Sequence, residues 1–119
     1  MEGRPQFHVE LVQATESAAV VDLEGDVDIY SAPQFKDVLL QGIDEGAQRI
    51  IVDLAKVSFI DSSGLGVVVG GAKRVLPING TLDIVCRDDN IARIFETTGL
   101  ERIFGIYPTR EEALKVLTG

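Results

Sequence analysis

The chain has 119 residues, 45% of them hydrophobic, and its 11 Lys and Arg stand against 19 Asp and Glu, for a formal net charge of −8. This length and apolar content fit one folded domain over residues 1–119 and argue against an intrinsically disordered chain. The acidic balance argues against direct binding of nucleic acid, because affinity for DNA and RNA rests on Lys and Arg beside the phosphates.

Cysteine usage and hydropathy indicate where the chain acts. Cys86 is the only cysteine, so no internal disulfide can form, and we expect a reducing compartment and a buried thiol. No N-terminal run resembles a signal peptide, and no stretch approaches the ~20 apolar residues that span a bilayer. We therefore expect a cytoplasmic protein that does not enter the membrane.

The first elements read as a β-hairpin. Phe7, Val9 and Leu11 alternate with polar residues, and a valine-rich run follows over 18–23. Only a short polar segment around 15–17 separates the two runs, which is typical of two antiparallel strands joined by a turn.

A helix and a central strand are expected next. Ser31 predicts a helix start, with Pro33 in the first turn and Gln34 completing a capping box, and Gly46 predicts the end. The nearly continuous apolar run over 49–54 is typical of a strand that is covered on both faces.

The remaining elements alternate in the same way. We expect a helix with its apolar stripe over 65–76, closed by Pro77 and Gly80, and then a strand over 81–86. The next helix is capped around Asp88 and ends at Gly99, and a strand over 103–107 follows it. A terminal helix begins with a capping box at 109–112 and contains Leu114 and Leu117. The order β-β-α-β-α-β-α-β-α predicts an α/β fold with a mixed, mostly parallel sheet of about five strands and about four helices.

The segment over 61–66 carries the most unusual chemistry. Ser62 and Ser63 follow Asp61 where a buried strand turns into a helix, whose first amides have no intrahelical partners and whose dipole is positive there. We expect these amides to hold a phosphate attached to this segment, which adds about −1.5 to −2 charge units. Asp and Ser are also the commonest N-caps, so a purely structural role for Asp61 and Ser62 stays open.

The predicted helix contains four glycines, which are unfavourable in a helix interior. Gly64, Gly66, Gly70 and Gly71 each cost a helix interior about 1 kcal/mol relative to alanine. Either close helix–sheet packing or the approach of another molecule's backbone accounts for such a cost. For Gly70 and Gly71 we expect close packing.

A second acidic segment, Gly25-Asp26-Val27-Asp28, follows the predicted second strand. Because the carboxyl ends of parallel strands meet at one edge of a sheet, we expect Asp26 and Asp28 to lie beside Ser62. Carboxylates there would repel a phosphate or bind Arg or Lys of a partner.

These segments resemble a known family. Residues 59–67 resemble the signature of anti-sigma factor antagonists, the bacterial single-domain branch of the STAS family. Residues 25–28, followed by Ala32 and Pro33, resemble the family's first motif, and residues 94–100 resemble its late helix and turn. The resemblance runs from about Val20 to Leu117, which is nearly the whole chain.

The resemblance implies a binding switch that is not an enzyme and needs no cofactor or metal. In the family, the unphosphorylated antagonist binds an anti-sigma factor, a serine kinase of the histidine-kinase-like ATPase fold, and the sigma factor is released. Phosphorylation of the serine that corresponds to Ser62 ends binding, and a metal-dependent serine phosphatase restores it. The partner-binding residues that the resemblance implies are Asp26, Asp28, Asp61, Ser62, Ser63 and Gly64.

Other functions are weighed against this one. A constitutive protein-interaction or small-ligand module of the same fold, without phosphoregulation, stays open. A dinucleotide site is disfavoured because Gly70 comes one residue too late for G-x-G-x-x-G. A serine hydrolase is disfavoured because the serines lack the preceding glycine of a nucleophile elbow and the only histidine, His8, is expected to face solvent on the first strand. One His and one Cys far apart predict no metal site, Asp88 is expected to be a solvated cap, and the role of Asp53 stays open.

Overall fold

The computed structural model describes residues 6–118, with side chains up to residue 115. Its elements are β1 (His8–Gln13), β2 (Ala18–Val27), α1 (Ala32–Asp44), β3 (Arg49–Ile60), α2 (Ser62–Val75), the 3₁₀ turn η1 (Leu76–Ile78), β4 (Thr81–Val85), α3 (Asp89–Thr98), the 3₁₀ turn η2 (Leu100–Arg102), β5 (Ile106–Tyr107) and α4 (Arg110–Thr118). The strands form one sheet in the order β1-β2-β3-β4-β5. Only the β1–β2 pair is antiparallel, which confirms the predicted hairpin and the mixed, mostly parallel α/β fold.

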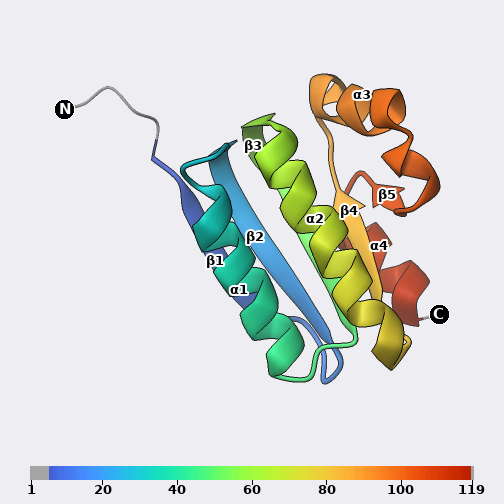
Figure 1. Ribbon diagram of the computed structural model, residues 1–119. Coiled ribbons are helices and arrows are strands. Elements are labelled where there is room, and N and C mark those ends of the chain that lie inside the picture. The colour runs from blue at the N-terminus through green and yellow to red at the C-terminus, as the bar shows by residue number, and fades with distance from the viewer. Residues whose placement is uncertain (1–5, 119) are drawn as a thin grey trace.

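The helices cover the two faces of the sheet unequally. Figure 1 shows α1 and α2 side by side over one face, and α4 lies on the other face. Alternate residues of β3 serve the two sides: Ile50 and Val52 join the larger core beneath α1, α2 and α3, whereas Ile51 joins a smaller core with Ala113 of α4. The expectation that the middle strand is covered on both faces is therefore confirmed.

The strands β2 and β3 are longer than predicted. The sequence pattern placed their ends at residues 23 and 54, but pairing continues to Val27 and Ile60. The prediction that residues 25–28 follow the strand is therefore wrong for Gly25 to Val27. Two register shifts in the β2–β3 ladder, one of them beside Gly25 with its φ of +102°, break the alternation while the pairing goes on.

The predicted capping box at 31–34 is also wrong. The Ser31 hydroxyl donates to the Asp26 carbonyl oxygen at 2.7 Å and accepts from the Asp28 amide at 2.9 Å, and it caps no amide of α1. Pro33 removes one amide that a cap would bind. Ser31 instead fixes the loop between β2 and α1, while the other predicted start at 109–112 is confirmed by a 3.1 Å bond from the Glu112 amide to Thr109 Oγ1.

The region after α3 contains less strand than predicted. Of residues 103–107, only Ile106 and Tyr107 pair with β4. The amides of Ile103 and Phe104 donate to the Leu100 carbonyl oxygen at 2.9 and 3.1 Å, so these residues continue the turn η2 instead of pairing with β4. Phe104 packs edge-to-face on Phe95, with ring centroids 6.4 Å apart.

The helix ends are mostly where the sequence places them. Asp88 caps α3 by accepting from the Asn90 amide at 2.7 Å, and Gly99 ends it with a φ of +78°. Leu76, expected in the apolar stripe of α2, lies in η1 and is 68% exposed, because α2 ends at Val75. The side chain of Leu117 lies outside the described residues.

Asp53 has a structural role. Its side chain is almost fully buried and accepts from Arg110 Nε at 2.7 Å and from the Ala55 amide at 2.9 Å. The Arg110 guanidinium also pairs with Asp22 Oδ2 at 3.0 Å. This cluster attaches the start of α4 to β2 and β3, on the sheet face opposite α1 and α2.

Asp83 gives stability a pH dependence. Burial raises the pKa of its carboxyl above the ordinary value, although Oδ1 accepts from the Gly105 amide at 3.0 Å. A carboxyl with a raised folded-state pKa favours folding below its unfolded pKa, and that contribution is lost as the pH rises through the folded pKa. The ionised carboxylate therefore destabilises the fold at neutral pH.

We expect Asp83→Asn to stabilise the protein at neutral pH, because the amide oxygen still accepts from Gly105 without a buried charge. The gain should shrink as the pH falls through the raised folded-state pKa of Asp83, and it should be smallest below the unfolded-state pKa of about 4. Urea denaturation at both pH values measures this, with Asp37→Asn, at an exposed position of α1, as the control for charge removal. A lower urea midpoint for Asp83→Asn than for wild type at neutral pH would contradict the expectation.

Candidate functional site

The start of α2 presents Ser62 to solvent. Asp61 is the N-cap of this helix, and its Oδ1 accepts from the Ser63 amide at 2.8 Å and from the Gly64 amide at 3.2 Å. Ser62, the first residue of the helix, is exposed, whereas Ser63 is half-buried. Asp61 is therefore the cap, and the Ser62 hydroxyl is available to another molecule.

This arrangement corrects the expected role of the helix amides. The amides of Ser63 and Gly64 are not free to hold a phosphate, because the Asp61 carboxylate already occupies them. A phosphate on Ser62 would lie next to the Asp61 carboxylate, which already binds two of the backbone amides of the first turn. The added charge would remain directed toward solvent or a partner.

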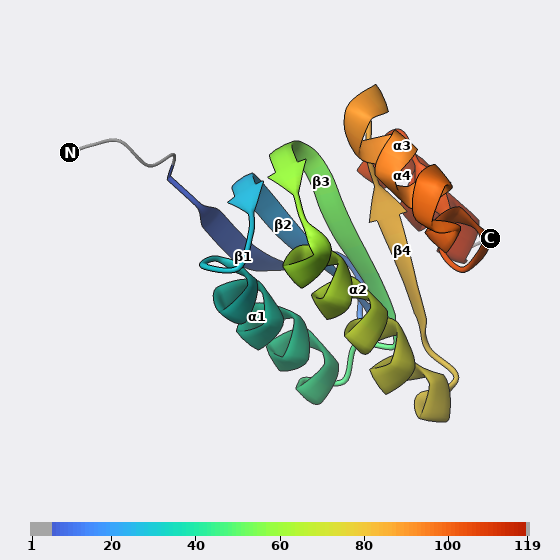
Figure 2. The same cartoon turned by 45° about the horizontal axis from the view of Figure 1, so that its top comes forward.

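The acidic segment lies at the same edge of the sheet, as predicted. Val27 pairs with Ile60 at the carboxyl ends of β2 and β3, and the Asp61 amide donates to the Val27 carbonyl oxygen at 3.1 Å. Asp26 and Asp28 flank Val27 and are half-buried. Figure 2 shows the β2–α1 loop and the start of α2 at the same end of the molecule. We call this region, residues 26–30 and 59–63, the Ser62 edge.

The Asp28 carboxylate braces its own loop. Its Oδ1 accepts from the Tyr30 amide at 2.9 Å and from the Ser31 amide at 3.1 Å. These bonds hold a tight turn between β2 and α1. Asp28 therefore sets the shape of the loop at the Ser62 edge.

Three large apolar side chains are exposed at the Ser62 edge. Ile29 is 64% exposed, Tyr30 73% and Phe59 49%. Exposed apolar side chains that form one patch mark surfaces that bind other proteins, so these three are candidates for such a surface. Sequence reasoning missed them; the only signal was an Ile-Tyr pair between an acidic turn and a helix start.

The glycines of α2 divide into two classes. A Cβ on Gly64 would lie 2.6 Å from Val27 Cγ1 and 2.7 Å from Ile60 Cγ1, and one on Gly71 would lie 2.6 Å from Leu39 Cδ2. Gly64 and Gly71 thus allow close packing, as expected for Gly71, and Gly64 is buried rather than presented to a partner. The prediction of close packing at Gly70 is wrong, because nothing lies within 4 Å of a Cβ at Gly70 or Gly66.

The residues considered for the rival sites lie on separate elements of the described chain. His8 is exposed on β1, as predicted, and β2 separates that strand from β3. Within residues 6–118, no three His, Cys, Asp or Glu side chains are grouped to hold a metal ion. No helix in the same range is long and apolar enough to cross a bilayer.

Comparisons with known proteins agree with this architecture. The anti-sigma-B factor antagonist of Bacillus subtilis (strain 168) is 37% identical over 95 residues, which cover 80% of this chain and 86% of that protein. An anti-sigma factor antagonist from Mycobacterium paratuberculosis superposes with a TM-score of 0.87 at 23% identity, covering 96% of both chains. The anti-sigma factor antagonist SpoIIAA in its unphosphorylated form superposes with a TM-score of 0.82 at 26% identity, covering 94% of this chain and 97% of that one.

The family model for the STAS domain matches residues 11–113. This range includes all five strands except the first residues of β1, and it includes the whole Ser62 edge. The family resemblance that the motifs indicated is therefore confirmed, and the chain belongs to the STAS domain family.

Proposed function

We propose that this chain is an anti-sigma factor antagonist controlled by phosphorylation of Ser62. The observation that carries the proposal is the exposed hydroxyl of Ser62 at the first residue of α2, among exposed apolar side chains. The likeness to the anti-sigma-B factor antagonist of Bacillus subtilis supports the choice of partner. The unphosphorylated chain binds an anti-sigma factor, and the sigma factor is released.

Binding uses the chemistry of the Ser62 edge. Ile29, Tyr30 and Phe59 supply apolar area. A neutral hydroxyl at Ser62 can be buried against a partner at a far lower cost than a charged group. Asp26 and Asp28 provide negative charge for Arg or Lys on the partner, and Ser63 continues the contact along α2.

Phosphorylation reverses this binding. The anti-sigma factor is also a serine kinase of the histidine-kinase-like ATPase fold, and it transfers the γ-phosphoryl group of ATP to Ser62 Oγ. A new O–P bond forms, the bond to ADP breaks, and the hydroxyl proton passes to a base of the kinase. The product carries about −1.5 to −2 additional charge units. Because Asp61 occupies two first-turn amides, the interface rather than the helix must accommodate this charge.

A metal-dependent serine phosphatase completes the cycle by hydrolysing the phosphate ester and restoring the hydroxyl. The exposure of Ser62 gives such an enzyme access without unfolding of α2. The chain itself acts as the substrate and the binding switch and performs no chemistry.

Intact-mass spectrometry tests this proposal. Wild type, Ser62→Ala and Ser63→Ala are incubated with ATP and an extract of the host. We expect one added phosphate on wild type and on Ser63→Ala, and none on Ser62→Ala. No phosphate on wild type, in an extract that phosphorylates other proteins, would favour a constitutive binding module instead. Phosphate on Ser62→Ala but not on Ser63→Ala would move the acceptor to Ser63.

A further inference from the structure

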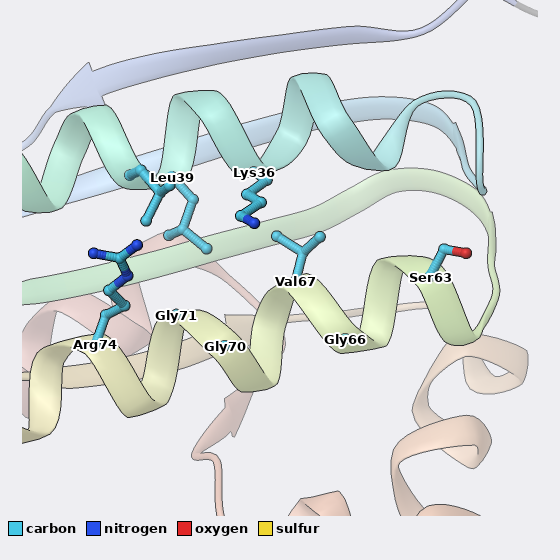
Figure 3. A pocket seen from close by; sticks show the side chains of 9 residues that line it. Lys36, Leu39, Ser63, Gly66, Val67, Gly70, Gly71 and Arg74 are labelled. Atoms are coloured by element: carbon cyan, nitrogen blue, oxygen red, sulfur yellow. The ribbon is translucent and has the colours of Figure 1, made fainter.

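A groove runs between α1 and α2. Its volume is about 320 Å³. Figure 3 shows its lining from both helices. Its lining includes Lys36 and Leu39 of α1 and Gly66, Val67, Gly70 and Arg74 of α2. Ser63 lines one end, so the groove continues directly from the Ser62 edge.

Two cations reach into this groove from opposite walls. Figure 3 shows Lys36 extending from α1 toward Val67, and Arg74 extending from α2 farther along, near Leu39. Every ion pair between described residues involves Asp22 or Asp53, so neither Lys36 nor Arg74 is neutralised by an acidic group in that part of the chain. In a chain with a net charge of −8, this groove carries locally unbalanced positive charge.

The floor of the groove favours an extended ligand over a compact anion. The side chain of Leu39 lies between the two cations, and Val67 lies beside Lys36 on the side toward Ser63, so the positive charges do not converge on one point. A single phosphate group needs several donors around one centre. Two carboxylates separated by an apolar side chain match the order cation, apolar floor, cation.

The exposed glycines fit the same ligand. Gly66 and Gly70 each cost α2 about 1 kcal/mol relative to alanine, and no neighbouring side chain explains the absence of a Cβ at either position. Without side chains there, a peptide backbone can approach α2 closely.

We propose that the α1–α2 groove binds an acidic segment of the anti-sigma factor that the proposed function assigns, with its carboxylates on Lys36 and Arg74. This inference rests on the proposed function and adds a second contact to it. The groove contributes affinity in the unphosphorylated state, and Ser62 makes that affinity dependent on phosphorylation.

Charge reversal tests the groove. Lys36→Glu and Arg74→Glu are each expected to weaken binding of the host's purified kinase-type anti-sigma factor about tenfold or more, and the loss should shrink at high salt. Lys73→Glu is the matched control, because Lys73 is adjacent, exposed and on the same helix but does not line this groove. Calorimetric titration measures the affinities.

Alanine variants of the two exposed glycines distinguish an effect on partner binding from an effect on folding. Gly66→Ala and Gly70→Ala should raise the melting temperature of the free protein, because each adds helix propensity in open space, and should nevertheless weaken binding. A variant that merely damaged the fold would lower both.

The binding experiments distinguish a failure of the groove inference from a failure of the proposed function. If Ser62→Asp abolishes binding while all four groove variants bind like wild type, the groove inference is wrong and the proposed function stands. If unphosphorylated wild type does not bind the anti-sigma factor, both fail. If inorganic phosphate displaces the partner and shifts only the groove's amide resonances in NMR spectra, the groove is a small-anion site and the inference is overturned.

Discussion

Ser62→Asp is expected to weaken binding of the anti-sigma factor by at least about 100-fold, because an uncompensated charge buried in an interface costs about 3–5 kcal/mol. Ser62→Ala should bind like wild type, since the hydroxyl makes no bond to a described residue that the alanine would lose. The Asp61 carboxylate already accepts hydrogen bonds from two first-turn amides, so these amides cannot stabilise the new charge. Titration calorimetry with the purified anti-sigma factor gives both affinities.

The control for this experiment is a charge of the same sign elsewhere. Thr97→Asp adds one negative charge at an exposed position of α3 and should change the affinity little. An equal loss of binding in Thr97→Asp would mean that the net charge, and not the position of Ser62, governs the interaction. Tight binding by Ser62→Asp would remove the physical basis of the switch.

The order of elements was predictable because local patterns determine most of it. The hairpin before residue 24, the apolar run that becomes the first half of β3, and the caps at Asp88 and Thr109 all depend on neighbours within a few residues. The later halves of β2 and β3 were missed because pairing between the strands, and not alternation along either of them, extends them through register shifts.

The sequence predicted the location of the candidate site but not its hydrogen bonds or the neighbouring groove. The motifs indicated Ser62 and its edge, and the carboxyl ends of β2 and β3 do meet there. The sequence left open whether Asp61 and Ser62 are only caps, and the structure assigns that role to Asp61, whose carboxylate binds two helix amides. The groove with Lys36 and Arg74 joins two helices from distant parts of the chain, so no local pattern reports it.

Gly64→Ala is expected to lower the free energy of unfolding by about 1–3 kcal/mol, the usual cost of adding volume to a packed site. The new Cβ would lie 2.6 Å from Val27 Cγ1 and 2.7 Å from Ile60 Cγ1. Val27 and Ile60 are buried and β-branched, so they have little rotamer freedom with which to give way. Urea denaturation, with the slope checked for a two-state transition, measures the loss.

Gly66→Ala is the matched comparison, two residues along the same helix. Its Cβ would have nothing within 4 Å, so alanine should raise the free energy of unfolding by about 0.5–1 kcal/mol through helix propensity alone. Opposite signs at Gly64 and Gly66 would show that Gly64 acts by seating the start of α2 against the ends of β2 and β3, which is how it holds Ser62 at the surface. A loss of stability at both positions would mean that Gly66, like Gly64, is required by the packing of the free protein, and the proposed approach of a partner along Gly66 would lose its structural reason.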